Sequence, residues 1–209
     1  METGKRAEFP LVTAIIAAVN VTVFLISDLI LYQKQDMIAF YMALNPFLVL
    51  EKNEYWRIVT SMFYHFGIEH LMSNMFMLLV LGTLLEPFFG RVRYAVLYFA
   101  SGIIASGVSI LYNTLVLRES GSLVFCAGAS GAIYGLIGAF VAIFIFRGKQ
   151  LSVQEKSRMV FAVFFLLFGG LFEKGVGHDA HFGGFFAGIL LGSVYCFLLK
   201  RKVFSDKQK

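Results

Sequence analysis

Four polar residues stand out in this apolar sequence because their side chains could together carry out nucleophilic catalysis. They are one serine, Ser130, two histidines, His70 and His181, and one asparagine, Asn74. A serine hydroxyl is a weak nucleophile until a base removes its proton, and a histidine that is neutral near pH 7, such as His181, is a suitable base. The Ser130 amide, His70 and Asn74 are possible hydrogen-bond donors to an oxyanion. These residue types predict a serine hydrolase site if the fold brings them together.

Each of the four residues also has a structural explanation when it is taken alone. A serine in a membrane helix commonly packs against, or hydrogen bonds to, a neighbouring helix. The string GASG, residues 128–131, does not follow a strand as the nucleophile elbow of soluble hydrolases does. The functional hypothesis therefore depends on whether the elements of the fold place all four residues together.

The composition predicts an all-α polytopic membrane protein. The 209-residue chain is 58% hydrophobic and 15% charged, with a mean hydropathy of +0.76, whereas soluble domains are about 45–50% apolar and about 25% charged. We expect one membrane domain over residues 1–209. The net charge of +5 does not indicate nucleic-acid binding, because the basic residues lie in short loops between apolar runs.

Six apolar runs are long enough to cross a hydrocarbon core of about 30 Å. The first run is too long for a signal peptide and lacks a small-x-small cleavage site, so we expect a transmembrane helix there. Residues 32–65 form a long first loop, whose apolar stretch around Pro46 is expected at the membrane interface. The predicted spans are residues 11–31, 66–85, 92–114, 124–146, 157–173 and 179–199.

The distribution of lysine and arginine predicts the orientation of these spans. Of 18 basic residues, 13 fall on the side of the two termini and five on the other. The positive-inside rule then places both termini in the cytoplasm. With this topology His70, Asn74, Ser130 and His181 all lie at a similar depth near the outer face. Polar groups inside the membrane are functional candidates by default, and their shared depth favours a common site.

Small residues predict which helices approach each other. They recur along two of the spans at helical spacing, which lets backbones come close. The two sets are Gly128, Gly131, Gly135, Gly138 and Ala142, and Ala180, Gly184, Gly188 and Gly192. If these two faces pack together, Ser130 comes within hydrogen-bond reach of His181.

Four motifs carry a specific family resemblance. EYWR (54–57), HFGIEHLMSN (65–74), GASG (128–131) and AHFGGFFAG (180–188) resemble, in this order and over nearly the whole chain, the rhomboid intramembrane serine proteases. The resemblance implies a six-helix bundle, a Ser130–His181 dyad without an acidic third member, and an oxyanion site from His70, Asn74 and the Ser130 amide. It also implies an endopeptidase that cleaves transmembrane protein substrates in or near the lipid bilayer through an acyl-enzyme, with neither cofactor nor metal.

The resemblance implies supporting roles for further residues. Tyr134 would stack on the ring of His181 and hold it. Glycines would seat the helices around the dyad, namely Gly128, Gly131, Gly184 and Gly188. Structural roles would fall to Glu54, Arg57 and His65 in the first loop and to Glu86, which would tie helices together.

Other functions remain as alternatives. A catalytically silent rhomboid-like protein that binds membrane proteins, or takes part in their quality control, would have the same fold. A transporter is less consistent with polar groups gathered at one face, and a metal or haem protein would have to use the four histidines without an HExxH motif.

Three further residues bear on these alternatives. Cys126 and Cys196 are predicted near opposite membrane faces, so we expect no disulfide between them. Asp179, two residues from His181, would point away from it on a helix. We expect a bacterial cytoplasmic membrane as the location.

Overall fold

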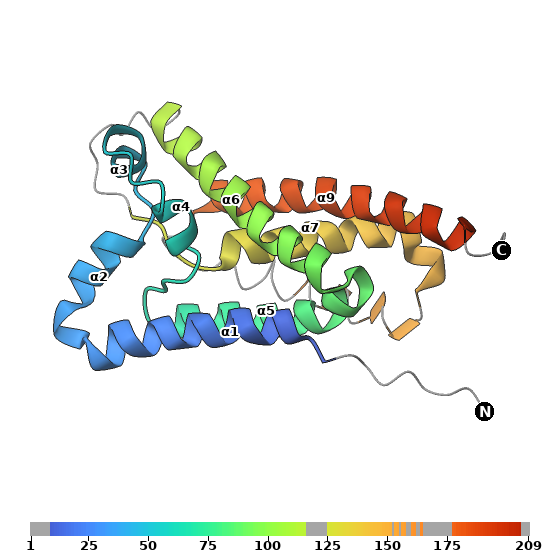
Figure 1. The fold of residues 1–209 in the computed structure, drawn as a ribbon, viewed down its shortest axis with the longest axis horizontal. Helices are drawn as coiled ribbons and strands as arrows, with labels where there is room; N and C mark the ends of the chain where they lie inside the picture. Colours follow the sequence, from blue (N-terminus) through green and yellow to red (C-terminus); the bar gives the residue numbers. More distant parts are fainter. Residues whose placement is uncertain are drawn as a thin grey trace.

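The computed structural model describes residues 9–115, 125–151 and 177–205, together with residues 153, 154, 156, 157, 160, 161 and 164. The described residues form helices and one isolated β-bridge (Figure 1). The elements are α1 Leu11–Phe24, the π-helix η1 Leu25–Ile30, the 3-10 helix η2 Tyr32–Lys34, α2 Gln35–Met42, α3 Pro46–Glu51, α4 Arg57–Thr60, α5 Ile68–Phe89, α6 Arg91–Leu115, α7 Ser130–Arg147, the 3-10 helix η3 Gly148–Gln150, and α9 His178–Ser205.

Five helices in the described part of the chain are long and apolar enough to cross a membrane. They are Leu11–Ile30, Ile68–Phe89, Arg91–Leu115, Ser130–Arg147 and His178–Leu199, which correspond to five of the six predicted spans. The all-helical, polytopic fold class is thereby confirmed. The remaining predicted span, 157–173, falls largely outside the described residues.

One predicted boundary is wrong in a way that matters for the site. The span expected at residues 124–146 begins only at Ser130, because residues 125–129 are not helical. Instead, Cys126 pairs with Leu44 of the first loop in an antiparallel bridge, with N–O distances of 2.8 and 2.9 Å. Ser130 is therefore the first residue of its helix, and the bridge ties the segment before it to the first loop.

The other boundaries differ by a few residues. The span predicted at 66–85 lies at Ile68–Phe89 and keeps Pro87 in its last turn. The span predicted at 179–199 begins at His178 and continues to Ser205. The first span, predicted at 11–31, changes from an α-helix to a π-helix at Leu25.

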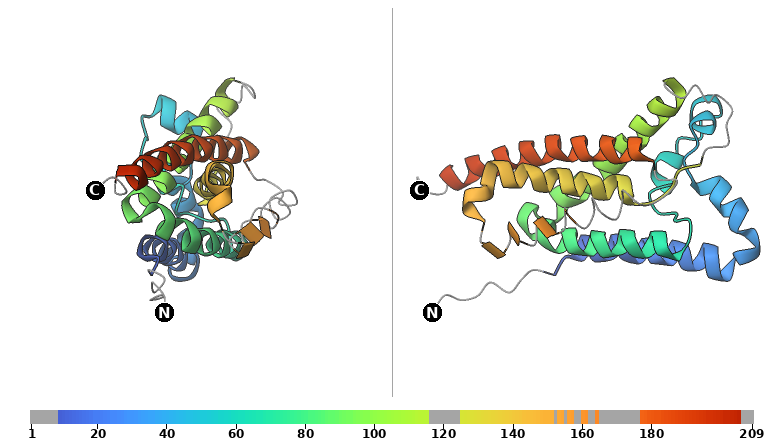
Figure 2. Two further views of the ribbon diagram at one scale, coloured as in Figure 1. Left: turned by 90° about the vertical axis from the view of Figure 1, so that its right-hand side faces the viewer. Right: turned by 180° about the vertical axis from the view of Figure 1, so that it is seen from behind.

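Helix α7 occupies the centre of the bundle. It is the most buried of the five spans and packs against α5, α6 and α9. Figure 2 shows α9 running alongside α7, and α1 alongside α5. The starts of α1 and α5 lie at opposite ends, and α1 begins at the end of the bundle where α9 finishes (Figure 1). The orientation of that end toward the cytoplasm stays a prediction.

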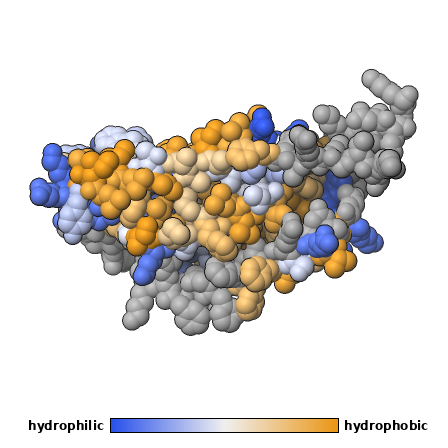
Figure 3. Space-filling model, turned by 90° about the horizontal axis from the view of Figure 1, so that it is seen from below, coloured by the Kyte–Doolittle hydropathy of each residue, from blue (hydrophilic) through white to orange (hydrophobic). Residues whose placement is uncertain are grey.

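The outside of the bundle is apolar along its length. Figure 3 shows hydrophobic residues over the middle of one face, with hydrophilic residues mainly toward the two ends. Large apolar side chains such as Ile15, Leu111, Phe186 and Leu190 are exposed. Such a surface is unfavourable in water and suits contact with lipid.

Arg57 organises the first loop from its interior. Its side chain is 0% exposed, its Nη1 donates to the carbonyls of Phe40 and Ala43, and its Nε donates to Glu54 Oε2 at 2.6 Å. The guanidinium also lies 5.4 Å from the centroid of the Phe40 ring. A buried charge is tolerated only when it is paired and hydrogen bonded, so these contacts fix the loop around Arg57 and Glu54.

Glu86 joins α5 to the start of α1. Its carboxylate accepts hydrogen bonds from the amides of Val12 and Thr13 at 2.9 and 2.8 Å, and from Thr13 Oγ1 at 2.8 Å. The first amides of a helix have no intrahelical acceptor, and a carboxylate is favourable at that end of the helix dipole. Glu86 therefore caps one membrane helix from another.

Candidate active site

Ser130 and His181 meet where α7 and α9 begin. Ser130 Oγ lies 2.9 Å from His181 Nε2, which is ordinary hydrogen-bond distance. His181 is buried, so little water competes for this contact. A hydroxyl within reach of an imidazole nitrogen is the arrangement that activates a serine nucleophile.

The close approach of α7 and α9 depends on glycine. A Cβ placed on Gly184 would lie 1.9 Å from the carbonyl oxygen of Gly131, and one on Gly188 would lie 1.8 Å from that of Gly135. Real Cβ atoms essentially never come within 3.0 Å of such an atom. Only glycine permits these backbones to touch, and the contact sets the distance between Ser130 and His181.

The ring of His181 is held in place by Tyr134. The two ring centroids are 4.0 Å apart and the planes differ by 12°, so the rings are stacked. Tyr134 lies one turn after Ser130 on α7, and the same helix therefore supplies both the hydroxyl and the surface under the imidazole. His178 lies at the edge of His181, with a centroid distance of 6.3 Å.

Besides the bridge between Cys126 and Leu44, two hydrogen bonds fix the non-helical segment before Ser130. Gly128, with φ of +122°, donates its amide to the carbonyl of Ser61 at 2.8 Å, and the Ala129 amide donates to His65 Nε2 at 3.3 Å. Glycine adopts this backbone conformation without strain. The Ser130 amide follows at the first helical residue, where a helix offers no internal acceptor. It is well placed to donate to a developing oxyanion.

His65 is a neutral hydrogen-bond acceptor for the backbone at residues 128–130. Its side chain is 1% exposed, and burial lowers the pKa of His65 to about 3. The unprotonated Nε2 is therefore retained at physiological pH and can accept the Ala129 N–H. The ring of His65 also contacts His70, with centroids 5.0 Å apart.

Helix α5 brings His70 against Gly128, in the segment that precedes Ser130. A Cβ added to Gly128 would lie 2.7 Å from His70 Cε1 and 2.8 Å from His70 Nε2, so the imidazole edge lies directly against this glycine. Asn74, one turn later, is buried and donates one Nδ2 hydrogen to the His70 carbonyl at 2.8 Å. An amide nitrogen carries two hydrogens, so a second remains. His70 directly contacts Gly128, and Asn74 is joined to His70 by this hydrogen bond.

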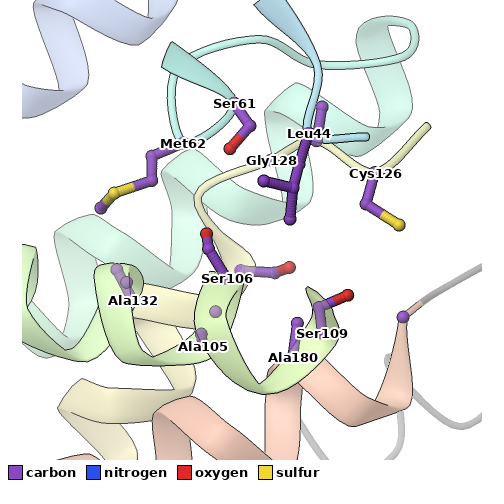
Figure 4. A pocket seen from close by; sticks show the side chains of 15 residues that line it. Leu44, Ser61, Met62, Ala105, Ser106, Ser109, Cys126, Gly128, Ala132 and Ala180 are labelled. Atoms are coloured by element: carbon purple, nitrogen blue, oxygen red, sulfur yellow. The ribbon is translucent and has the colours of Figure 1, made fainter. Parts of the chain in front are cut away.

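A small cavity adjoins Ser130 between the first loop and helices α6, α7 and α9 (Figure 4). Its volume is about 50 Å³, and Ser61, Ser106 and Ser109 line it together with Ser130 and several glycines and alanines. Hydroxyls in a space of this size suit a few water molecules. Ser106 and Ser109 were not predicted as site residues, although small and hydroxyl residues recur at helical spacing through residues 102–109.

The structure also places Asp179 and the two cysteines. Asn113 Nδ2 donates to Asp179 Oδ2 at 3.4 Å, which links the start of α9 to α6. Both cysteines are free; Cys126 lines the cavity, where burial raises the pKa of its thiol. Cys196 lies toward the far end of α9, and its carbonyl accepts from Arg147 Nη2 at 3.1 Å. In the part of the chain that the structure describes, no three His, Cys, Asp or Glu residues are grouped to hold a metal ion.

Comparison with known proteins identifies the family. The model of the rhomboid domain matches residues 52–197. The chain belongs to the rhomboid family. This match contains the residues of the site named above, from Ser61 to Gly188.

Plant and bacterial rhomboid proteins are among its relatives. The chain is 35% identical to RHOMBOID-like protein 1 of Arabidopsis thaliana, over 73% of this chain and 38% of that protein. RHOMBOID-like protein 4 of the same plant is 37% identical, over 70% and 35%. Rhomboid protease GluP of Bacillus subtilis is 29% identical, over 69% and 27%. The chain spans less than half the length of each of these relatives.

Family membership and the apolar helices together make this chain an integral membrane protein. Two bacterial relatives are named as proteases, Rhomboid protease GluP and the putative rhomboid protease YdcA, both of Bacillus subtilis.

Proposed function

We propose that this chain is an intramembrane serine endopeptidase in which Ser130 is the nucleophile and His181 the general base and acid. The contact of 2.9 Å between Ser130 Oγ and His181 Nε2 carries the proposal. His181 takes the hydroxyl proton while Ser130 attacks the scissile carbonyl carbon. Collapse of the tetrahedral intermediate breaks the C–N bond, and His181 gives its proton to the leaving amine. Water, deprotonated by His181, then hydrolyses the acyl-enzyme.

The oxyanion of each tetrahedral intermediate would be held by three donors. The Ser130 amide lies at the start of α7, His70 lies against Gly128, and Asn74 has an amide hydrogen beyond the one it gives to His70. Loss of one such donor typically lowers the rate on the order of 10²–10³-fold.

The hydrolytic water would come from the cavity beside Ser130. Its volume of about 50 Å³ and its serine lining supply room and hydrogen-bond partners for water at the nucleophile. This matters because the surrounding bundle is otherwise apolar. No step of this mechanism calls on a cofactor.

The substrates are proposed to be transmembrane proteins whose helix unwinds near the cut. In a membrane helix every carbonyl is hydrogen bonded within the segment, so the scissile carbonyl must first be released. Glycine, proline and other weak helix formers lower the cost of this unwinding. The membrane would be the bacterial cytoplasmic membrane.

The proposal is tested by reconstituting the purified protein in liposomes with a fluorescent single-span substrate. Wild type is expected to cleave it and Ser130→Ala to stay at background. Ser193→Ala is the matched control, because Ser193 on α9 bonds only to the carbonyl of Ile189 among the described residues, and it should cleave like wild type. His70→Ala should retain about 1% of the rate or less.

Two outcomes would contradict the proposal. Equal cleavage by wild type and Ser130→Ala would place the nucleophile elsewhere. Substrate capture without cleavage by the wild type would favour the catalytically silent binding protein.

A further inference from the structure

An open groove lies at the end of the bundle away from Ser130, where α5 turns into α6. It has a volume of about 690 Å³ and is lined by Phe9, Phe89, Gly90, Arg91, Val92 and Arg93. Gly90, with φ of +81°, makes the sharp turn between the two helices. The groove is therefore built from the residues just before α1 and from the connection between two membrane-spanning helices.

Two arginines give this groove its charge. Arg91 is exposed and Arg93 is half-buried. Arg93 Nη1 donates to the carbonyl of Phe89 at 3.2 Å, which anchors the guanidinium at the groove. A guanidinium has five N–H donors, so most of those on Arg93 remain for another acceptor.

No carboxylate in the described part of the chain neutralises these arginines. The one ion pair there joins Arg57 to Glu54 in the first loop. Glu86, which precedes the turn on α5, directs its carboxylate to the amides and hydroxyl at the start of α1. Among the described residues, the two arginines of the groove thus have no carboxylate partner, which favours an anionic ligand.

Exposed apolar side chains border the same groove. Phe9 is 65% exposed and Val92 is 77% exposed, and both lie next to the ends of membrane-spanning helices. Guanidinium groups bind phosphate through paired N–H donors. A phosphate attached to an acyl chain would satisfy the arginines and cover the exposed apolar side chains, which a free phosphate ion would not do.

We propose that this groove binds the headgroup of an anionic phospholipid, with Arg91 and Arg93 on its phosphate. Basic pockets at the membrane surface are attracted to anionic lipid headgroups, and the effect weakens within a Debye length. The groove is at the end of the bundle for which the sequence predicts 13 of the 18 basic residues. The lipid would link the start of α1 to the α5–α6 turn.

Photo-crosslinking in liposomes tests this site directly. The full-length protein is reconstituted with trace phosphatidylglycerol or phosphatidylcholine that has a photoreactive group near the headgroup, and the adducts are mapped by mass spectrometry. Phosphatidylglycerol should label Phe9 and residues 89–93 in preference to phosphatidylcholine. Arg91→Gln/Arg93→Gln should weaken this labelling about 30-fold, since each basic residue near the surface contributes about a factor of five.

A matched control separates the site from general charge. Lys34→Gln/Lys52→Gln removes the same number of positive charges from exposed positions in the first loop and should change labelling less than twofold. Arg91→Lys/Arg93→Lys keeps the charge but not the paired donors and should give an intermediate value, which also serves if the glutamine variant fails to fold.

Three results would overturn the proposal. They are equal labelling by the two lipids, an equal loss in the two glutamine double variants, and competition by inorganic phosphate as effective as competition by unlabelled phosphatidylglycerol. The last result would identify a site for soluble phosphate instead of lipid.

Discussion

Replacing Gly184 by alanine should separate α7 from α9 and uncouple Ser130 from His181. The new Cβ would start 1.9 Å from the Gly131 carbonyl oxygen, and real contacts of this kind are essentially never shorter than 3.0 Å, so the helices must part by about 1.1 Å. Gly131 follows Ser130 directly and Gly184 lies one turn after His181. The hydroxyl–imidazole distance of 2.9 Å would therefore grow to about 4 Å, beyond hydrogen-bond range.

The expected effect is large on activity and moderate on stability. A misplacement of about 1 Å between reacting groups costs on the order of 100-fold in rate, whereas overpacking of a core typically costs about 1–3 kcal/mol. Cleavage of a fluorescent single-span substrate measures the first effect. Labelling of Ser130 by a fluorophosphonate measures base-assisted nucleophilicity without a protein substrate, and thermal unfolding in detergent measures the stability.

Two other glycines provide matched controls. In Gly183→Ala the new Cβ would lie 2.7 Å from the Cβ of Val108 on α6. This contact is with α6, so the packing of α7 against α9 should be kept. Gly107→Ala meets no atom within 4 Å. Both variants should react with the fluorophosphonate and cleave the single-span substrate at rates within about threefold of wild type. If Ser130 of Gly184→Ala is labelled at the wild-type rate, the contact between Gly184 and Gly131 does not set the distance between Ser130 Oγ and His181 Nε2.

Three further predictions concern the residues around the dyad and in the first loop. Tyr134→Leu removes the ring stacked at 4.0 Å on the His181 imidazole and should lower kcat about tenfold with little change in KM, while Tyr134→Phe should restore most of the activity. Burial lowers the pKa of His65 to about 3. Below pH 6.5 the unfolded chain therefore binds a proton at this residue that the folded protein does not. The free energy of unfolding should be highest above pH 6.5 and fall by up to about 1.4 kcal/mol per pH unit toward pH 3. Unfolding midpoints from pH 7 to 5 measure this slope, which His65→Gln should flatten; an unchanged slope would contradict the assignment. Glu54→Gln leaves the buried Arg57 without its ion-pair partner and should cost about 3 kcal/mol in denaturant unfolding, against little change for the exposed Glu51→Gln; equal midpoints for the two would argue against a stabilising pair.

Much of the architecture could be predicted from the sequence because a membrane imposes simple rules. Long apolar runs must be helices, since no other open structure satisfies its backbone in lipid, and five of the six predicted spans lie in the described residues at nearly the expected positions. Rows of glycine and alanine indicated which helices approach each other. Polar residues at one depth pointed to Ser130 and His181, whose side chains the structure brings to 2.9 Å.

The segment before Ser130 could not be predicted from local pattern. Residues 125–129 are as apolar as a helix, yet a bridge to Leu44 and the hydrogen bond from Ala129 to His65 hold them in a non-helical form. Both partners lie more than 60 residues away in the chain, so no window of sequence contains the competition. For the same reason the start of α7 was expected too early.

Hydrophobicity and spacing are local properties of the chain, so they indicated which residues could do chemistry and on which helices they lie. The distances between those residues depend on the folded structure. The contact of Gly184 with Gly131, the stacking of Tyr134 on His181 and the buried anchor at Arg57 are set by packing between distant segments. Packing at atomic contact leaves little freedom of distance, and a hydrogen bond between hydroxyl and imidazole requires that precision.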